Sequence, residues 1–456
     1  MVEPITASFR DPSGFVFKKD GRIYRQVNTG YAKVYDMLME SGLYSALVEQ
    51  KLLVPHREVD RIPLQIDAFK VLLPEQIPFI SYPYEWCFSQ LKDAALLTLQ
   101  VQKLALSFGM TLKDASAYNV QFLRGKPVLI DTLSFEQFQG KPWVAYRQFC
   151  QHFLAPLALM AKVDLRLGTL SQIHLDGIPL DLAARLLPTS TKFSVGLLIH
   201  LQLHASSQAK HSDSTRAISH NRTLTKQQLL AIVESLESTV RSLKPPKQKT
   251  EWGGYYENTN YTTSAETHKR HLIEHWIAQA KPQRVWDVGA NDGTFAEIAS
   301  QKNIRTIATD IDPIAIERAY QRVKSRGEEN LLPLIVDITN PSHAIGWANQ
   351  ERDSFLSRGT FDVTLCLALI HHLAIGNNVP FGYLARLFAA QTKQLIIEFV
   401  PKDDTNAQRL LRSRPDIFPH YTKHDFELEF SKYFQIVDQK AIHDSRRILY
   451  FMKAKQ

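Results

Sequence analysis

The chain has 456 residues with a formal net charge of +8, 44% of them hydrophobic and 22% charged. This composition is ordinary for a soluble globular protein, and the length exceeds what one hydrophobic core supports, so about two or three domains are expected. The three cysteines, at positions 87, 150 and 366, stand singly, which indicates neither a disulfide framework nor a zinc cluster.

Nothing in the sequence indicates a membrane segment. The longest apolar run, residues 193–201, is interrupted by His200 and is far short of the roughly twenty residues that span a bilayer. The first residues lack the apolar core of a signal peptide. Basic residues are dispersed apart from short clusters at 244–249 and 412–414, which are typical of a solvated surface, so nucleic acid is not indicated as a partner. We expect a cytoplasmic protein, and the sequence does not specify its oligomeric state.

Two hairpins and a long helix are predicted in the amino-terminal part. Alternating residues over Phe15–Val27, with Asp20 and Gly21 between them, predict the first hairpin. Leu91–Phe108 predicts the helix. A second hairpin follows, in which Asn119 opens one strand and the returning strand brings Asp131 near it.

The order of polar residues around the second hairpin is similar to the catalytic and metal-binding segments of the protein-kinase-like fold. The resemblance covers about twenty residues and implies an α+β domain in which Asp114 is the catalytic base, while Asn119 and Asp131 hold magnesium. Mg-ATP would then be a cofactor.

Several departures from this family favour a degenerate, substrate-positioning domain over an active phosphotransferase. Lys113 precedes Asp114 in place of the usual arginine or glycine, and Thr132 and Leu133 replace the Phe-Gly pair. No glycine-rich phosphate loop appears in the first hairpin, and Lys70 is the nearest candidate for the nucleotide-binding lysine.

Two polar segments divide the chain. Residues 206–222 and the segment that begins at Ser242 read as exposed loops, and apolar residues at helical spacing over 224–243 predict a connecting helix between them. We therefore expect three parts: a kinase-like domain over residues 1–205, a linker with a helix over 206–251, and a second domain over 252–456.

The sequence Arg284–Gly293, RVWDVGANDG, predicts a nucleotide-like binding turn at the end of a buried strand. The residues that follow, 294–300, predict a helix. Gly289 and Gly293 allow a tight reversal and a close ligand. The dinucleotide pattern would require further glycines at Asn291 and Thr294, so NAD is disfavoured. A carboxylate at Asp287 would repel a pyrophosphate but suits a cationic ammonium or sulfonium group. This favours S-adenosylmethionine.

Further apolar strands follow, two of which end in an acid. Asp310 ends residues 306–310 at the distance where a carboxylate accepts ribose hydroxyls, and Asp337 ends 332–337, where it can reach an adenine amino group. Residues 361–369 and 395–400 predict the fourth and fifth strands. Short apolar strands that alternate with helices indicate an α/β fold with a doubly wound, mostly parallel sheet.

Residues from about 252 to 455 resemble the class I S-adenosylmethionine-dependent methyltransferases, with a Rossmann-like fold. The resemblance implies cofactor contacts by residues of its first motif, its acidic second motif and its adenine-side motif, which are Asp287, Gly289, Asn291, Gly293, Asp310, Asp337 and Ile338. The segment after the fourth strand is similar to the small-molecule branch and lacks the N-P-P-Y or D-P-P-Y run of the DNA and glutamine N-methyltransferases. More loosely, the flanking segments look like methyltransferases among nodulation proteins.

His371 and His372 directly follow the fourth strand and are the candidate catalytic residues. A histidine near its ordinary pKa suits removal of the proton from an alcohol or phenol. A helix cap or a hydrogen bond to a carbonyl explains either histidine equally well. Glu398, which ends the fifth strand, could orient a substrate or pair with a lysine.

Three functional hypotheses follow. The first is a methyltransferase that acts on an oxygen, rather than a nitrogen, of a small-molecule or saccharide-like acceptor. The second is a bifunctional kinase and methyltransferase that phosphorylates and then methylates its acceptor. The third is a non-catalytic binding protein.

Overall fold

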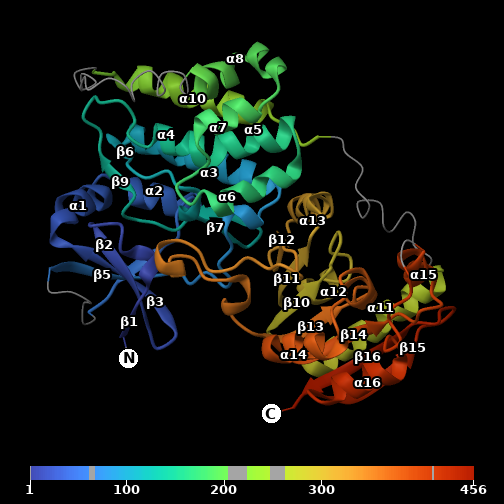
Figure 1. The fold of residues 1–456 in the computed structure, drawn as a ribbon. Helices are drawn as coiled ribbons and strands as arrows, with labels where there is room; N and C mark the ends of the chain where they lie inside the picture. The colour runs from blue at the N-terminus through green and yellow to red at the C-terminus, as the bar shows by residue number, and fades with distance from the viewer. Residues whose placement is uncertain (1, 61–66, 204–222, 247–261, 413–414, 456) are drawn as a thin grey trace. The chain divides into compact units, whose positions relative to one another are not determined.

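The computed structural model describes residues 2–60, 67–203, 223–246, 262–412 and 415–455 (Figure 1). These residues form two compact units. Unit 1 comprises Met1–Lys247 and Ala344–Asp353, and unit 2 comprises Gln248–His343 and Ser354–Gln456. Most of the two predicted polar linkers, at 206–222 and after Ser242, lies outside the described residues. No helix in the described ranges has the length and apolar character needed to cross a membrane.

Unit 1 contains a sheet of five strands in the order β1-β2-β3-β5-β4, with every neighbouring pair antiparallel. The strands are β1 (Val2–Pro4), β2 (Gly14–Lys19), β3 (Arg22–Asn28), β4 (His56–Glu58) and β5 (Ala68–Pro74). The predicted first hairpin is confirmed as β2 and β3. Asp20 and Gly21 have φ angles of 51° and 75°, as a two-residue hairpin turn of the primed type requires.

Helices make up most of the rest of unit 1. They are α1 (Ala32–Glu40), α2 (Leu43–Glu49), α3 (Phe88–Ser107), α4 (Tyr146–Phe149), α5 (Ala155–Lys162), α6 (Leu170–Ile173), α7 (Leu180–Leu186), α8 (Val195–Leu197) and α10 (Lys226–Ser242). The predicted long helix is α3. The predicted connecting helix is α10, which packs against α3, buries Leu229, Val233 and Leu236, and is part of unit 1.

Two small antiparallel pairs complete unit 1. They are β6 (Met110–Leu112) with β9 (Phe135–Gln137), and β7 (Val120–Leu123) with β8 (Lys126–Leu129). The β7–β8 pair is the predicted second hairpin, with Arg124 and Gly125 at positive φ in its turn. All described strand pairs of unit 1 are antiparallel, unlike the parallel strands of an α/β fold, so it is an α+β unit.

Residues 344–353 group with unit 1 although they follow a strand of unit 2 in the chain. Ile345 packs against Tyr82, Tyr84 and Tyr118. Arg10 Nη2 lies 2.7 Å from Glu351 Oε1. The segment therefore contributes both apolar and charged contacts to unit 1.

Unit 2 contains a sheet of seven strands in the order β12-β11-β10-β13-β14-β16-β15. The strands are β10 (Arg284–Val288), β11 (Arg305–Asp310), β12 (Leu331–Ile335), β13 (Phe361–Cys366), β14 (Thr392–Phe399), β15 (Phe434–Ala441) and β16 (Ile448–Ala454). The first five are parallel to one another, whereas β16 is antiparallel to both β14 and β15. The order reverses between β10 and β13. In open parallel sheets a ligand crevice lies at such a point, at the carboxyl ends of the strands.

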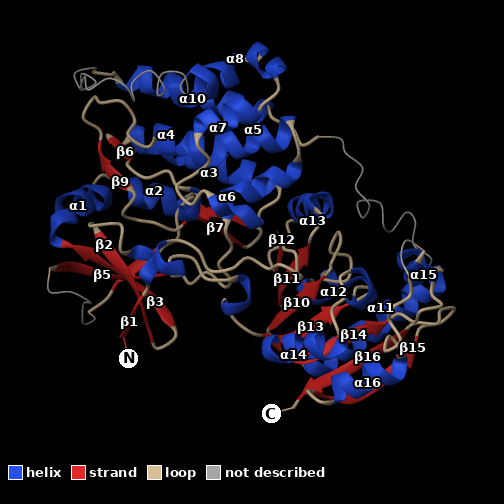
Figure 2. Ribbon diagram, in the orientation of Figure 1, coloured by secondary structure: helices blue, strands red, loops and turns tan. Residues whose placement is uncertain are grey.

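Helices flank this sheet (Figure 2). They are α11 (Thr263–Ala280), α12 (Glu297–Ser300), α13 (Pro313–Arg326), α14 (Phe381–Gln391), α15 (Thr405–Leu411) and α16 (Lys423–Ser431). Trp276 and Ile273 of α11 belong to the same core cluster as Val285 and Val363 of the central strands. Unit 2 is therefore α/β, with a mostly parallel, doubly wound sheet as predicted.

Several predicted elements differ in length from the observed ones. The third strand was expected to end at Asp337 but ends at Ile335, and the fifth was expected from residue 395 but begins at Thr392. The fourth strand was expected to reach residue 369 but ends at Cys366, because Ala368 has a φ of 49° and cannot continue an extended chain. The helix after the glycine turn was expected from Thr294 but begins at Glu297. The antiparallel strands β15 and β16 were not predicted.

Candidate cofactor cavity

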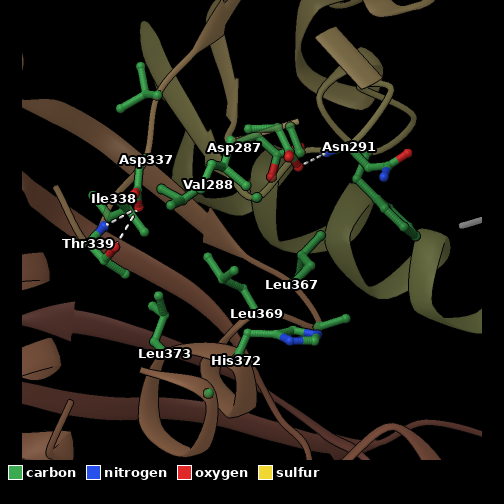
Figure 3. Close-up of a pocket in the computed structure, with 18 of the residues that line it drawn as sticks. Asp287, Val288, Asn291, Asp337, Ile338, Thr339, Leu367, Leu369, His372 and Leu373 are labelled. Atoms are coloured by element: carbon green, nitrogen blue, oxygen red, sulfur yellow. Dashed lines mark hydrogen bonds between the residues drawn. The ribbon is translucent and has the colours of Figure 1, made fainter. Parts of the chain in front are cut away.

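A cavity of about 340 Å³ lies at the carboxyl ends of β10, β11, β12 and β13 in unit 2 (Figure 3). Its volume falls within the range of small-molecule pockets. Its lining includes seven of the predicted site residues, namely Asp287, Gly289, Asn291, Asp310, Asp337, Ile338 and His372. Gly293 and His371 are not among the lining residues. The cavity lies where the strand order predicts a crevice.

The glycine turn after β10 forms one wall. The N–H groups of Gly289 and Ala290 both donate to the carbonyl of Thr309, at 2.8 and 2.9 Å, which ties the turn to β11. Gly289 has a φ of 71°, and a Cβ atom there would lie 3.0 Å from Leu369 Cδ1. A side chain at Gly289 would therefore both strain the backbone and displace the facing wall. Gly293, with a φ of 82°, serves the turn through its backbone conformation.

Asp310 is held in place by the turn. Its Oδ2 accepts the N–H of Asn291 at 2.8 Å, and its Oδ1 accepts the N–H of Asp312 at 2.9 Å. Burial nevertheless raises the pKa of Asp310 to about 6. The carboxylate is thus oriented at the end of β11 before any ligand enters.

Asp287 is the least compensated charge of the cavity. The side chain is buried, and its Oδ2 has no hydrogen-bond partner among the described residues. Burial raises the pKa of Asp287 to about 7, against the opposing influence of Lys269. A buried carboxylate of this kind is costly unless a cation or a donor approaches it.

Lys269 lines the cavity beside Asp287 but belongs to a buried ion network, which we define as Lys269, Glu398, Arg447 and Asp404. Lys269 Nζ lies 2.6 Å from Glu398 Oε2, and Arg447 Nη1 lies 3.2 Å from Glu398 Oε1. Arg447 Nε lies 2.8 Å from Asp404 Oδ2. The two cations balance the two carboxylates of the network, so the charge of Asp287 is additional. Of the two roles considered for Glu398, the structure shows the pairing with a lysine.

Asp337, Ile338 and Thr339 form the opposite end of the cavity, after β12. Asp337 Oδ1 accepts the N–H of Thr339 at 2.8 Å and its hydroxyl at 2.6 Å (Figure 3). These two hydrogen bonds fix the Asp337 carboxylate in a local turn. Ile338, which lies within this turn, lines the cavity.

The two candidate histidines occupy different environments. His372 lines the cavity at the start of a π-helical turn, His372–Gly376, whereas His371 is fully buried, and neither of its ring nitrogens has a hydrogen-bond partner among the described residues. Burial lowers the pKa of His371 well below its usual value and the pKa of His372 to about 4. Both imidazoles are therefore neutral near pH 7, and His372 is the one that lies in the cavity wall.

Sequence reasoning missed Lys269 and Phe295, which also line the cavity. Lys269 Nζ lies 4.5 Å from the centroid of the Phe295 ring. A signal for Lys269 was present, because it shares a helical face with the apolar residues Ala265, Leu272 and Trp276. A lysine on the buried face of a helix is rare without a partner.

In unit 1 the three residues singled out by the kinase-like resemblance lie close together. Asn119 and Asp131 both hydrogen-bond the hydroxyl of Ser134, at 3.3 and 2.6 Å. Burial and the nearby Asp131 raise the pKa of Asp114. Arg25 Nη2 lies 2.9 Å from Asp131 Oδ1 and 2.9 Å from Asp11 Oδ2, so its guanidinium is shared between these two carboxylates. Within the described part of the chain, no three acidic, histidine or cysteine side chains are placed to bind a metal ion.

Comparison with known proteins identifies one close relative over nearly the whole chain. No family model matches the sequence. Nodulation protein NoeA of Rhizobium meliloti (strain 1021) is 35% identical over 455 residues, which cover 98% of this chain and 95% of that protein.

Solved structures give much weaker similarities. N-methyltransferase NodS of Bradyrhizobium japonicum WM9 matches at 14% identity and a TM-score of 0.33, over 42% of this chain and 98% of that one. Magnesium protoporphyrin IX methyltransferase of Synechocystis PCC 6803 with bound SAH matches at 15% identity and a TM-score of 0.31, over 44% of this chain and 93% of that one.

Proposed function

We propose that this chain, which belongs to the family of nodulation protein NoeA, is an S-adenosylmethionine-dependent methyltransferase that acts on an oxygen of a small-molecule or saccharide-like acceptor. The observation that carries the proposal is the buried carboxylate of Asp287, whose Oδ2 has no hydrogen-bond partner among the described residues, in a cavity that Asp310 and Asp337 also line. A ligand with a cationic amino-acid end, a ribose and an adenine has the groups that these three acids would bind in this order.

Each part of the cavity suits one part of such a ligand. Asp287 would attract the ammonium group, Asp310 would accept the ribose hydroxyls, and Asp337 with Ile338 would contact the adenine. Bound there, S-adenosylmethionine would supply an electrophilic methyl group. The protein would hold the acceptor in line with that group, exclude water and remove one proton.

His372 is the proposed proton acceptor. It lines the cavity and its imidazole is neutral at pH 7, although burial lowers its pKa to about 4, below the near-ordinary value on which the sequence-based expectation rested. His371 lies outside the lining and is assigned no contact with the acceptor. Asn377 binds the carbonyl of His372 through both its backbone and its side-chain N–H groups at 3.0 Å, which holds the π-helical turn.

For unit 1 we propose a role in substrate capture and not in phosphoryl transfer. The Arg25–Asp131 ion pair supports this choice, because a magnesium ion at Asp131 would have to displace a bound guanidinium. The bifunctional alternative, with Mg-ATP as a cofactor, would require that displacement. The non-catalytic alternative would require that the cavity bind no methyl donor.

The first test is calorimetric titration with S-adenosylhomocysteine, which has the same ribose and adenine as the methyl donor. The Asp310→Asn variant is expected to bind it about 2 kcal/mol more weakly. The two carboxylate oxygens of Asp310 accept the N–H groups of Asn291 and Asp312, and in the proposal they also accept the ribose hydroxyls. The amide of asparagine has only one oxygen for these contacts.

Asp312→Asn is the matched control, because Asp312 lies two residues away, caps α13 through its accepting oxygen and does not line the cavity. Its affinity should equal that of the unmodified protein. The proposed function would be excluded if the unmodified protein showed no measurable binding.

Affinity for the same ligand is also expected to depend on pH. Since the folded-state pKa of Asp287 is raised to about 7, this acid is protonated at lower pH and then cannot pair with the ligand ammonium. Affinity should rise between about pH 6 and pH 8, by at most about tenfold per pH unit for one proton released. Calorimetry in buffers of different ionisation enthalpy would measure that release. The Asp287→Asn variant should bind weakly and keep only the smaller dependence near pH 6 that the raised pKa of Asp310 causes. Equal affinity of the unmodified protein at pH 6 and pH 8 would contradict the assignment.

A further inference from the structure

We infer that Glu398 is a positioning residue, whose carboxylate holds the backbone of Ala368 in a left-handed conformation and thereby sets the segment 367–377 that carries His372 into the cavity. The inference rests on the proposed function for the role of His372. The hydrogen bond and the backbone conformation that carry it are independent of the ligand.

Ala368 is a strained position in the cavity wall. Its φ of 49° lies in the left-handed region, which costs free energy at any residue with a Cβ atom. Such conformations persist where the surrounding structure over-determines them, and they concentrate at functional sites. Ala368 lines the cavity and follows the end of β13 by two residues.

Glu398 makes the contact that holds Ala368 in this conformation. Its Oε2 accepts the N–H of Ala368 at 2.9 Å. Strand β14, which carries Glu398, pairs with β13 up to Cys366 and Ile397, so Glu398 lies directly beside the point where the chain leaves β13. The bond therefore stands at the place where an extended strand becomes a turn.

The buried ion network fixes the Glu398 carboxylate. Lys269 lies on one of its oxygens and Arg447 on the other, and Arg447 is held in turn by Asp404. Asp404 also caps α15, by accepting the N–H of Asn406 at 2.9 Å. Helix α15 packs against the π-helical turn that begins at His372. The network thus contacts the segment 367–377 in two ways: through Glu398 at Ala368, and through Asp404 by way of α15.

The conformation of Ala368 sets the path of the next residues in the chain. Leu369 is directed against Gly289, where an added Cβ atom would lie 3.0 Å from Leu369 Cδ1. The carbonyl of Leu369 accepts the N–H of His372 at 2.9 Å and that of Leu373 at 3.3 Å. A residue 368 in extended conformation would continue β13 and would break this first turn, so His372 would leave the cavity wall.

Hydrogen exchange measured on the full chain tests the inference without an acceptor. In the Glu398→Gln variant one amide oxygen must serve Ala368, Lys269 and Arg447, so exchange in peptides that cover 367–377 should rise about tenfold or more. Adding Ala368→Gly should reverse much of that rise, because glycine adopts positive φ without a steric penalty. If Glu398 only stabilised the fold in general, Ala368→Gly would not lower the exchange of the Glu398→Gln variant.

Two further variants sharpen the test. Glu297→Gln is the matched control, since Glu297 is a buried glutamate paired with Arg322 and Arg326 outside the cavity lining; it should leave exchange at 367–377 unchanged. Ala368→Val, which keeps the ion network intact, should raise exchange in the same peptides, and it tests the idea even if Glu398→Gln fails to fold.

The inference is overturned if Glu398→Gln raises exchange equally throughout unit 2, if Ala368→Gly gives no reversal, or if Ala368→Val exchanges like the unmodified protein. Titration with S-adenosylhomocysteine on the same samples separates this outcome from failure of the proposed function. Absent binding with the predicted exchange pattern would reject the methyl donor and keep the positioning role. Normal binding without the predicted exchange pattern would keep the methyl donor and reject the positioning role of Glu398.

Discussion

Replacement of Arg447 with methionine is expected to lower the free energy of unfolding of unit 2 by about 3–5 kcal/mol. Arg447 is fully buried and contacts the carboxylates of both Glu398 and Asp404. Methionine fills part of the same volume but removes the guanidinium that pairs with Asp404 and one of the two cations that pair with Glu398. Urea unfolding, followed by hydrogen exchange of peptides from β14 and β16, would measure the change for unit 2 separately from unit 1.

Arg446 offers a matched control at the adjacent position. It pairs with Asp403, and both side chains of this pair are mostly exposed. Ion pairs of this kind contribute little, so Arg446→Met should change stability by less than about 0.5 kcal/mol. Equal stability of the Arg446 and Arg447 variants would contradict the view that the buried network holds this end of the sheet together.

Local sequence patterns predicted the elements that depend on local physics. Asp20 and Gly21 predicted the first hairpin because few residue pairs accept two positive φ angles. The strands β10 to β14 were found because each is a short apolar run in a sheet covered on both faces. The strands β15 and β16 were not predicted. Their order in the sheet depends on contacts between residues far apart in the sequence, because β16 lies between β14 and the earlier strand β15.

The candidate site was predictable where it depends on the carboxyl ends of parallel strands. Asp287, Asp310 and Asp337 were expected along one edge of the sheet, and the structure places all three around one cavity. The positive φ of Ala368 was not predictable, because it is imposed by Glu398 from a neighbouring strand. The different surroundings of His371 and His372 result from that same turn, so the sequence alone could not separate them.

Replacement of His372 with alanine is expected to lower the rate of methyl transfer about a hundredfold, the typical contribution of one general base. The imidazole lines the cavity and is neutral at pH 7, because burial lowers its pKa to about 4. In the unmodified protein, at saturating S-adenosylmethionine, the rate should accordingly hold from pH 8 down to about pH 5 and fall as the pH approaches 4, where the ring of His372 becomes protonated. Transfer of a labelled methyl group from S-adenosylmethionine to acceptors in a metabolite extract would measure both effects.

Two controls decide whether a loss of rate in His372→Ala reflects lost chemistry or lost structure. His424→Ala removes an exposed histidine on α16 and should retain the full rate. His372→Ala should still bind S-adenosylhomocysteine within about threefold of the unmodified protein, because the proposed cofactor contacts belong to Asp287, Asp310 and Asp337. If the rate is unchanged while binding persists, His372 is not the base, and an acceptor that ionises without help, such as a carboxylate, becomes the better explanation of the cavity. If binding is lost together with the rate, the turn that carries His372 supports the cofactor wall itself.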